Sequence, residues 1–596
     1  MKDMVEKYYE KRLAEAKEEL NLLQKKVNDV STYRLLAIVA AAVLFYFLLK
    51  TSLLITLAVG IGVLLGFYQL VKYHDSVTDQ FNLQKVMLDV IENEINILNG
   101  GSSVYDDGER FENPKHRYSG DLDVFGDFSL YHKINRAKTE EGTTALARKF
   151  LESPVASEIS EAHESVKELA EKDVWRQQFQ ASLFELKKTE TEGLTGLEQP
   201  PVLKMEWLIS LYPVLKWVLP LGLVAAFYFG SVTAGTICLF AFLGLHFGLS
   251  GMNKELTEPY YYKLKGISRE LGYYHQASLL ILNENWQSKV LKKAFELLPT
   301  DTGEKDPILS FQRITKKIEM KDNQLSAFFL YLFSPFDLVE MIRLRKWVNA
   351  HPDFFKRIFE AIGQFEVYTS LGTLAFNEKE WTYPEIKTGD RVVIKAKSVG
   401  HPLMKNAVCN DFELKETNRL TLITGSNMSG KSTFLRTTGC NILLAYAGAP
   451  VFAKQFELTD QIQLFAYMRI KDSLQENAST FKAEIDRIRL LLDAMKNEPK
   501  ALILVDEMLR GTNSEDKLKG SIAFLEEVIA ANAFAMVATH DLRTTEMTTK
   551  YPNSVNNFYF EYDSKDGELS FDYQLKEGVC KSFNASELLR SVGLKV

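Results

Sequence analysis

Gly425-Ser-Asn-Met-Ser-Gly-Lys-Ser-Thr433 is the stretch that decides the fold of this chain, and it directly follows the apolar run Leu420-Thr-Leu-Ile-Thr424. A glycine, four residues and then Gly-Lys-Ser is the pattern of a phosphate-binding loop between a buried strand and a helix N-terminus. The two glycines allow a tight turn in which successive backbone N–H groups face an anion. We expect Lys431 to add a positive charge for the β- and γ-phosphates and the Ser432 hydroxyl to bind Mg²⁺. The loop therefore predicts a site for a nucleoside triphosphate.

The candidate nucleotide-binding residues lie in this one loop. They are Gly425, Ser426, Asn427, Met428, Ser429, Gly430, Lys431, Ser432 and Thr433. Short patterns of this kind also occur by chance in strand-to-helix turns that bind nothing, so the rest of the chain has to decide between the two interpretations.

Two other apolar runs end in side chains that suit a triphosphate site. Ala501-Leu-Ile-Leu-Val505 is typical of a central parallel strand, and Asp506 and Glu507 follow it. A carboxylate at such a strand end can hold Mg²⁺, and the next one can orient the water that attacks the γ-phosphate. Ala535-Met-Val-Ala538 is followed by Thr539 and His540, and this histidine suits a γ-phosphate sensor, although a lone strand-end histidine usually has no such role.

The order of these three elements favours one catalytic site. Its expected catalytic residues are Lys431, Glu507 and His540, and its expected Mg²⁺ ligands are Ser432 and Asp506.

Several segments near the loop resemble the MutS-type DNA mismatch repair ATPases, which belong to the ABC class. The Asn427-Met428 pair inside the loop is characteristic of that family. The other segments that resemble it are Gly400-His-Pro-Leu-Met404, Asn410-Asp411, Ser479-Thr-Phe-Lys-Ala-Glu484, Asp506-Glu-Met-Leu-Arg-Gly-Thr512, Ala538-Thr-His540, Tyr573 to Gly578 and Ser582 to Gly593. Together they cover roughly residues 390 to 594.

The resemblance implies an α/β P-loop ATPase domain with an ABC-like mixed sheet, with ATP and Mg²⁺ as cofactors. It also implies a composite site, so we expect a homodimer in which Ser479 completes the nucleotide site of the partner. The chain departs from the family where Ser426 replaces the usual Pro, Ser429 and Leu509 replace Gly, and Asn477-Ala478 replaces Gly-Arg. Ser429 is small enough to keep the loop intact, whereas Leu509 and Ala478 lie in segments that are near the dimer interface in the family.

A weaker resemblance extends toward the N-terminus. Asp121 to Leu130, Lys138 to Gly142 and Phe150 to Pro154 resemble the start of the family's helical lever domain. Ala361 to Ser370 resembles the helix that leads from the lever to the ATPase, and it also fits an ordinary amphipathic core helix. The resemblance implies an all-α lever domain ahead of the ATPase.

Two long apolar blocks interrupt the polar sequence. The first runs from Leu35 to Leu49 and from Leu53 to Val71, and the second runs from Trp207 to Ser250 with a polar break at Ser231. A helix that spans a membrane needs about 20 mostly apolar residues, so each block has room for a hairpin of two short spans. The alternative is a pair of buried helices in a soluble core, but such helices usually carry a polar stripe that these blocks lack. We therefore predict two transmembrane helical hairpins.

The polar segments around the blocks set the predicted topology. Segments 1–34, 72–206 and 252–596 are too polar to cross a membrane, and each hairpin returns the chain to the side from which it came. An ATPase needs cytosolic nucleotide, so this side is the cytoplasm. We predict an integral protein of the inner or plasma membrane whose lever and ATPase lie on the cytoplasmic side. Lys50, in the turn on the outer side, is a minor exception to the charge rule.

The predicted organisation has six parts. They are a charged helical N-terminal arm (1–34), a first transmembrane hairpin (35–71), the first part of a helical lever domain (72–206), a second transmembrane hairpin (207–250), the second part of the lever (251–388) and a MutS-like ATPase domain (389–596).

Composition agrees with this organisation and argues against other classes. The chain has 596 residues, of which 46% are hydrophobic, enough for several cores and for the apolar spans. Its four cysteines show no paired spacing, which argues against a disulfide framework or a zinc site. The formal net charge of −7 is spread along the chain, and no segment has the basicity of a dedicated nucleic-acid arm.

Two classes of function remain open on the sequence. Family resemblance implies a DNA-linked role in repair or recombination. However, the family's mismatch-reading wedge, a Phe-x-Glu in a domain ahead of the lever, is not found, and the segment between the first hairpin and the lever is shorter than a usual domain. The second hairpin lies about where the family inserts its DNA clamp, so we hypothesise that a membrane hairpin replaces the clamp. The alternative is a mechanochemical ATPase that acts on membrane or protein partners without DNA.

Overall fold

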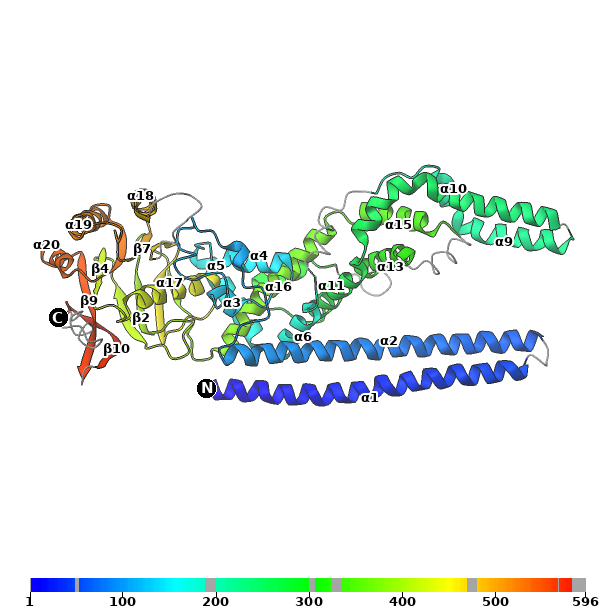
Figure 1. Cartoon of the computed structure of the whole chain (residues 1–596), viewed down its shortest axis with the longest axis horizontal. Helices are drawn as coiled ribbons and strands as arrows, with labels where there is room; N and C mark the ends of the chain where they lie inside the picture. Colours follow the sequence, from blue (N-terminus) through cyan, green and yellow to red (C-terminus); the bar gives the residue numbers. More distant parts are fainter. Residues whose placement is uncertain are drawn as a thin grey trace.

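The computed structural model describes most of the chain. The described residues are 2–48, 53–187, 194, 200–230, 232–299, 306–322, 334–468, 480–565 and 568–580. The molecule is elongated, with an α/β region at one end, a helical body in the middle and two helical hairpins that extend to the other end (Figure 1).

A six-stranded sheet forms the core of the α/β region, and its strand order is β10-β9-β4-β8-β7-β6. The strands are β4 (Leu420–Thr424), β6 (Gln463–Tyr467), β7 (Ala501–Asp506), β8 (Phe534–Thr539), β9 (Val555–Lys565) and β10 (Glu568–Glu577). Neighbouring strands from β9 to β6 pair in parallel, and β10 lies antiparallel to β9 at the edge. This mixed sheet agrees with the predicted α/β fold.

Helices cover both faces of this sheet, which explains why every residue of β4 and β7 is buried. On one face, Leu504 belongs to the same hydrophobic cluster as the buried residues of α17 (Lys431–Ala447). On the other face, Ile503 clusters with residues of α18 (Thr480–Asn497) and α19 (Ser514–Ala530). Successive residues of a strand point to opposite faces, so one apolar run serves both layers.

A second sheet has four strands in the order β1-β5-β2-β3. They are β1 (Glu385–Lys387), β2 (Ile394–Val399), β3 (Asn410–Leu414) and β5 (Gln455–Thr459). The pair β1–β5 is parallel, whereas β2 lies antiparallel to both β3 and β5. The Asn410 side chain joins the two sheets, because it hydrogen-bonds the main chain of Tyr573 and Leu575 in β10.

The helical body is built around α16 (Phe354–Asn377), most of whose residues are buried. The helices of the body are α3 (Leu130–Ile134), α4 (Glu140–Lys149), α5 (Ala156–Glu171), α6 (Asp173–Leu183), α8 (Glu206–Ser210), α11 (Ile267–Leu282), α12 (Lys289–Glu296), α13 (Pro307–Glu319) and α15 (Phe336–Ala350). Short helices elsewhere are η1 (Glu109–Phe111), η3 (Met320–Asp322), η4 (Leu542–Glu546) and α20 (Met547–Lys550).

The segments before and after the second apolar block pack together in this body. Trp175 of α6 meets Trp286 in a T-shaped contact with ring centroids 4.9 Å apart, and both rings contact Phe365 of α16. Within the described residues, the two predicted lever parts therefore form one packed body. Two separate, unpacked domains would have contradicted the hypothesis that the hairpin is an insertion in the lever.

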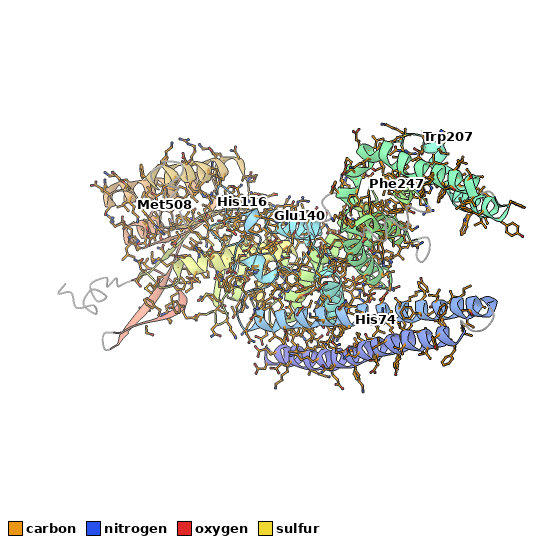
Figure 2. All side chains as sticks on the ribbon, turned by 45° about the vertical axis from the view of Figure 1, so that its right-hand side comes forward. His74, His116, Glu140, Trp207, Phe247 and Met508 are labelled. Atoms are coloured by element: carbon orange, nitrogen blue, oxygen red, sulfur yellow. The ribbon has the colours of Figure 1, made fainter. Side chains whose placement is uncertain are left out.

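The two apolar blocks form the outer ends of two helical hairpins. α1 (Lys2–Leu48) lies against α2 (Leu53–Leu98), and α9 (Tyr212–Tyr228) lies against α10 (Val232–Leu264). α1 has 47 residues and, at 1.5 Å per residue, is about 70 Å long. The charged arm and the first apolar segment are thus one continuous helix. The tips of both hairpins point away from the α/β region in the same direction (Figures 1 and 2).

Large apolar side chains cover the outer ends of both hairpins. Phe47, Tyr228 and Phe240 are 64%, 84% and 70% exposed. Among the described residues, two helices, Asp3–Leu48 and Val232–Leu264, are long and apolar enough to cross a membrane, and only 6% and 22% of their most apolar windows are buried. α9 has 17 residues, about 26 Å of helix, which is shorter than the hydrocarbon core of a bilayer. The four predicted spans therefore stay a prediction.

Candidate nucleotide-binding site

The phosphate-loop pattern forms a tight turn between β4 and α17. Gly425 and Gly430 have φ angles of +151° and +107°, which residues with a Cβ atom rarely adopt. A Cβ atom on Gly425 would lie 2.9 Å from the carbonyl oxygen of Phe560 in β9. Both glycines of the pattern are therefore required by the backbone path, and Lys431 starts the helix as in a strand–loop–helix phosphate site.

The Lys431 ammonium lies at the base of this loop. Lys431 is only 5% exposed, and its Nζ atom donates hydrogen bonds to the carbonyl oxygens of Gly425, at 2.9 Å, and Ser426, at 2.8 Å. Burial lowers the pKa of Lys431, while the nearby Glu507 and Asp506 carboxylates act in the opposite direction. The loop thus holds a partly desolvated cation, which an anionic ligand would stabilise.

Two serine hydroxyls support the fit of this loop to phosphate. The Oγ atoms of Ser426 and Ser429 are buried and make no hydrogen bond within the described residues. Buried polar atoms normally have partners, so unpaired hydroxyls in a loop of backbone N–H groups fit a bound anion. The side chain at position 429 is also small enough for the turn to close, as expected from the sequence.

The carboxylates predicted for Mg²⁺ and for the attacking water lie at the end of β7. Asp506 is 7% exposed, and one of its oxygens lies 3.5 Å from the Arg510 guanidinium. Glu507 has a φ angle of +54°, and its backbone N–H donates to the carbonyl oxygen of Ala538 in β8 at 3.1 Å. This hydrogen bond holds the chain in an uncommon conformation as it leaves the strand.

His540 contacts Glu507 directly. Its Nδ1 atom lies 2.9 Å from Glu507 Oε1, and Arg510 Nε lies 3.7 Å from Glu507 Oε2. Burial raises the pKa of Glu507, but the hydrogen bond and charge of His540 and the charge of Arg510 outweigh it, so the pKa lies below its usual value. Glu507 is therefore ionised at neutral pH, as a residue that accepts a proton from water must be.

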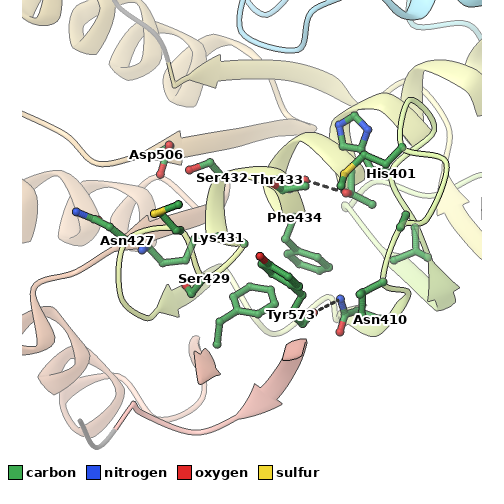
Figure 3. Close-up of a pocket in the computed structure, with 18 of the residues that line it drawn as sticks. His401, Asn410, Asn427, Ser429, Lys431, Ser432, Thr433, Phe434, Asp506 and Tyr573 are labelled. Atoms are coloured by element: carbon green, nitrogen blue, oxygen red, sulfur yellow. Dashed lines mark hydrogen bonds between the residues drawn. The ribbon is translucent and has the colours of Figure 1, made fainter. Parts of the chain in front are cut away.

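These residues meet in one cleft of about 720 Å³ (Figure 3), a volume that suits a nucleotide. The predicted residues that line it are Asn427, Met428, Ser429, Gly430, Lys431, Ser432, Thr433, Asp506 and Glu507. Gly425 and Ser426 contact Lys431 from the base of the loop, and His540 is connected to the cleft through Glu507. Ser479, the candidate for the partner's site, lies outside the described residues.

Ser432 and Asp506 fit a Mg²⁺ site. Both side chains lie at the same end of the cleft (Figure 3). A hydroxyl and a carboxylate are hard oxygen ligands, and Mg²⁺ usually takes only one or two protein ligands, with water and substrate phosphates as the others. The two side chains would therefore be sufficient to hold the metal beside a triphosphate.

The ring of Tyr573 also lines the cleft, although no local sequence pattern indicates this. The strand register shifts between Phe571 and Leu575 in β10, and such a bulge changes the direction of a side chain. Asn410 of β3 fixes the bulge, since its Nδ2 atom donates to Tyr573 O at 3.1 Å and its Oδ1 atom accepts from Leu575 N at 2.7 Å. Tyr573 is 43% exposed, and such a ring at the edge of a nucleotide cleft suits stacking on a base. Asn410-Asp411 and Tyr573 to Gly578 both resemble family segments, but neither resemblance indicates that the Tyr573 ring enters the cleft.

Leu509, a departure from the MutS pattern, has a φ angle of +56°, in the region that favours glycine. Its side chain is 7% exposed, and its Cδ1 atom lies 2.4 Å from the point where a Cβ atom of Gly520 would be. The missing side chain at position 520 therefore provides the space that Leu509 fills.

Comparison with known proteins shows which family this region is similar to. Residues 421–592 match the family model for MutS domain V. This region is MutS-like. The DNA mismatch repair protein MutS of Aquifex pyrophilus is 29% identical over 364 residues, which are 57% of this chain and 39% of that protein. The MutS proteins of Thermotoga neapolitana and Thermotoga sp. (strain RQ2) are 28% and 30% identical, over 56% and 41% of this chain and 40% and 31% of their own length.

The MutS-like region contains the phosphate loop, the end of β7 and His540. The alignment with the Aquifex protein is longer than the domain V match, so the similarity to MutS continues beyond residues 421–592. Residues 581–596, which include the segment Ser582 to Gly593 that resembles the family, lie outside the described residues. The chain spans less than half the length of these MutS relatives.

Proposed function

We propose that this chain is a membrane-anchored, MutS-like ATPase that binds and hydrolyses ATP with Mg²⁺ in a composite dimeric site and so moves its helical lever. One observation carries the proposal: the phosphate loop, a buried lysine and two strand-end carboxylates meet in a single cleft of about 720 Å³. This group of side chains suits phosphoryl transfer to water. Catalysis of that reaction depends on neutralising the charge of the phosphates and on orienting the attacking water.

Each side chain of the cleft has a distinct role in this proposal. Lys431 and the loop backbone bind the phosphates, and Ser432 and Asp506 hold Mg²⁺, which neutralises charge on the phosphate oxygens when bound. Glu507, kept ionised by its neighbours, orients the attacking water and accepts its proton. His540 senses the γ-phosphate through its contact with Glu507.

Exposed apolar side chains near the cleft support the proposal of a homodimer. Met428 and Met404 line the cleft and are 80% and 47% exposed. Phe481, which is 42% exposed, lies against Gly511, the residue after Arg510 of the cleft lining. Phe481 lies in the first turn of α18, next to the segment that contains Ser479. An apolar surface of this kind next to a polar cleft is typical of a region that a partner covers. In a composite ATPase the partner is a second copy of the chain.

Steady-state ATP hydrolysis by the full chain tests the proposed activity. We expect phosphate release that needs Mg²⁺ and that rises more steeply than linearly with protein concentration as dimers form. Lys431→Ala should abolish it, because the buried cation that the phosphates need is gone. Hydrolysis at the wild-type rate in Lys431→Ala would contradict the assignment of this cleft as the active site.

We further propose that the protein resides in the inner or plasma membrane with its lever and ATPase in the cytoplasm. The shared direction of the hairpin tips and their exposed apolar side chains support this, because such surfaces are stable in lipid and costly in water. Alkaline carbonate washing of a membrane fraction tests it. Retention of the chain in the pellet supports an integral anchor, and its release into the wash contradicts one.

DNA is the first candidate partner, since the relatives are named DNA mismatch repair proteins. A second candidate, an ATPase that acts on membrane or protein partners, is favoured by the surface of the α9–α10 hairpin. Trp217 and Phe240 there are 66% and 70% exposed, whereas DNA binding relies on basic side chains that neutralise phosphates. Electrophoretic binding to duplex, mismatched and branched DNA, with and without ATP, distinguishes the two. DNA binding and stimulation of hydrolysis favour the first, and indifference to all three forms favours the second.

We also propose that the α9–α10 hairpin takes the place of the MutS clamp in the lever. The hairpin lies in the chain between α6 and α11, and these two helices pack against each other. Replacing residues 207–250 by a short flexible linker should therefore leave a folded body, measured by circular dichroism, that hydrolyses ATP. Loss of cooperative unfolding in this variant would contradict the idea of an inserted hairpin.

A further inference from the structure

The α1–α2 hairpin reaches from its apolar tip to the rim of the nucleotide cleft. Val5, near the start of α1, lines a small cavity of about 130 Å³ together with Met404, which also lines the nucleotide cleft. Tyr9, Val90 and Ala181 belong to one apolar cluster that joins both helices of the hairpin to α6. Rigid elements that are packed in this way can transmit a displacement over a long distance.

A buried ion pair joins α2 to the body. Glu94 of α2 and Arg136, which follows α3, are each 2% exposed. Arg136 donates from Nη2 to Glu94 Oε2 at 3.0 Å and from Nε to Glu94 Oε1. Asn377, at the end of α16, donates to Glu94 Oε2 at 3.0 Å and accepts from the hydroxyl of Tyr9 in α1 at 2.9 Å. Each charge has a partner, and a satisfied buried network of this kind strongly favours one geometry.

Lys133 continues this series of contacts to the nucleotide cleft. Arg136 Nη1 donates to the carbonyl oxygen of Lys133 at 3.0 Å. The Lys133 ammonium donates to the carbonyl oxygen of Pro402 at 2.7 Å and pairs with Glu378 at 3.0 Å. Pro402 directly follows His401, which lines the cleft. Two residues, Arg136 and Lys133, therefore connect Glu94 of α2 to the segment that contains Pro402 and His401.

We propose that Lys133 is a positioning residue that couples the nucleotide cleft to the α1–α2 hairpin. Nucleotide binding that shifts the His401 segment also shifts Lys133 and, through it, the Glu94–Arg136 pair. By linkage, a change that lipid or a partner imposes on the hairpin alters nucleotide affinity by the same factor. The coupling rests on the proposed function, since it requires that the cleft bind nucleotide.

The choice of variant decides how clearly this coupling can be tested. Glu94→Gln leaves a buried guanidinium without its counter-charge and endangers folding. Lys133→Met keeps the apolar stem of a side chain that is 24% exposed and removes only its ammonium. Lys172→Met is a matched control, because Lys172 is 25% exposed and pairs with Glu284 at 2.9 Å. Each lysine also lies over a tryptophan ring, at 5.0 Å and 5.6 Å from its centroid.

Hydrogen–deuterium exchange of the full chain in lipid nanodiscs, with and without Mg²⁺ and the non-hydrolysable analogue AMP-PNP, measures both ends of the coupling. We expect AMP-PNP to slow exchange at residues 425–433 in all three proteins. Exchange at residues 84–98 of α2 should change about fivefold or more in the wild type and in Lys172→Met. This second change should be lost in Lys133→Met.

The two measured segments, residues 425–433 and 84–98, distinguish failure of the coupling from failure of the proposed function. Slower exchange at residues 425–433 with no change at 84–98 in the wild type would overturn the coupling and leave the nucleotide site standing. A change at 84–98 that survives in Lys133→Met would overturn the role of Lys133. Unchanged exchange at 425–433 would contradict the proposed function itself, and the coupling with it.

Discussion

Glu507 combines an uncommon backbone conformation with fixed side-chain partners. Its positive φ angle is held by a hydrogen bond to Ala538, and its carboxylate is held by His540 and Arg510. Such strain persists only where the surrounding structure maintains it, and it is common at functional sites. The neighbouring Asp506, by contrast, ends the strand in regular conformation, so the two adjacent carboxylates differ in their backbone conformation.

Glu507→Gln should lower the rate of ATP hydrolysis by roughly 10²- to 10⁴-fold, because an amide cannot accept the proton of the attacking water. Nucleotide affinity should change little, since the loop and Lys431 are intact. Single-turnover phosphate release and binding of a fluorescent ATP analogue measure the two quantities. Glu546→Gln, an exposed carboxyl in the nearby helix η4, is the control. A wild-type rate in Glu507→Gln would exclude this residue as the base.

Glu366, in the centre of the helical body, should make stability depend on pH. It accepts hydrogen bonds from the N–H groups of Lys138, at 2.7 Å, and Thr139, at 3.2 Å. Burial raises the pKa of Glu366 to about 7 from its usual 4.5, although these hydrogen bonds oppose the shift. The folded state therefore holds the proton more tightly than the unfolded chain. The stability that this provides is fully present below pH 4.5 and declines as the pH rises through 7.

Glu366→Gln should remove this component of the pH dependence, because the amide stays neutral and keeps a carbonyl oxygen for the backbone donors. Melting temperatures of wild type and variant at pH 5 and pH 8 measure it. We expect the melting temperature of the wild type to fall more between pH 5 and pH 8 than the melting temperature of the variant does. Glu140→Gln, at the more exposed start of α4, should behave as the wild type. Parallel curves for wild type and Glu366→Gln would show that the buried carboxyl does not titrate in this range.

At the scale of elements, α17 connects the nucleotide loop with the helical body. The helix begins at Lys431 and ends at Ala447, and Gly448, whose φ angle is +88°, caps its C-terminus. A Cβ atom at this glycine would lie 2.5 Å from the Cβ atom of Ala162 in α5. The end of α17 thus lies in close contact with α5 of the helical body, and no larger residue fits at this junction without a shift of α5.

Gly448→Ala should destabilise the protein by about 2–5 kcal/mol, from left-handed strain of about 1–2 kcal/mol and overlap of about 1–3 kcal/mol. A fall in the melting temperature by several degrees measures this effect. Gly120→Ala is the matched control, since a Cβ atom there meets no heavy atom within 4 Å. Equal melting temperatures for both variants would show that α5 moves away at little cost.

At the scale of the whole molecule, polar and apolar surfaces lie at opposite ends. The nucleotide cleft lies in the α/β region, and the exposed apolar ends of both hairpins lie far from it (Figure 1). Two of the native cysteines mark these two regions. Cys238 is exposed on α10, and Cys409 is partly exposed next to Val408 and Asn410 of the cleft. The reactivity of each of these two thiols therefore indicates whether the surface around it is exposed to water.

A membrane-impermeant maleimide should label Cys409 but not Cys238 when the protein is in vesicles with the ATPase outside, because the proposed membrane position places Cys238 of α10 out of reach of the reagent. Intact-mass and peptide analysis of the labelled protein measure this. Protein unfolded in detergent solution should be labelled at all four cysteines, which controls for intrinsic reactivity. Equal labelling of Cys238 and Cys409 in vesicles would contradict the membrane position of the second hairpin.

Much of the candidate site could be predicted from short stretches of sequence. The phosphate loop and the strand-end carboxylates depend on neighbours along the chain, such as the glycine spacing and the apolar run before Asp506. Tyr573 and Lys133 could not be predicted in this way. Their contacts with Asn410 and Pro402 join residues 163 and 269 positions apart, and they depend on a strand bulge and on helix packing.

The sequence by itself determined the phosphate loop, the apolar strands of the α/β region and the two apolar blocks, because spacing and hydrophobic pattern are local properties. Only the tertiary structure decided that Glu507 is paired with His540, that Leu509 is accommodated by Gly520, and that a buried ion pair ties α2 to the body. It also decided that both hairpins extend in one direction (Figure 1). Each of these contacts depends on packing between segments that are distant in the sequence. The energy of such packing depends on the shape and burial of the side chains, which cannot be read from a local sequence pattern.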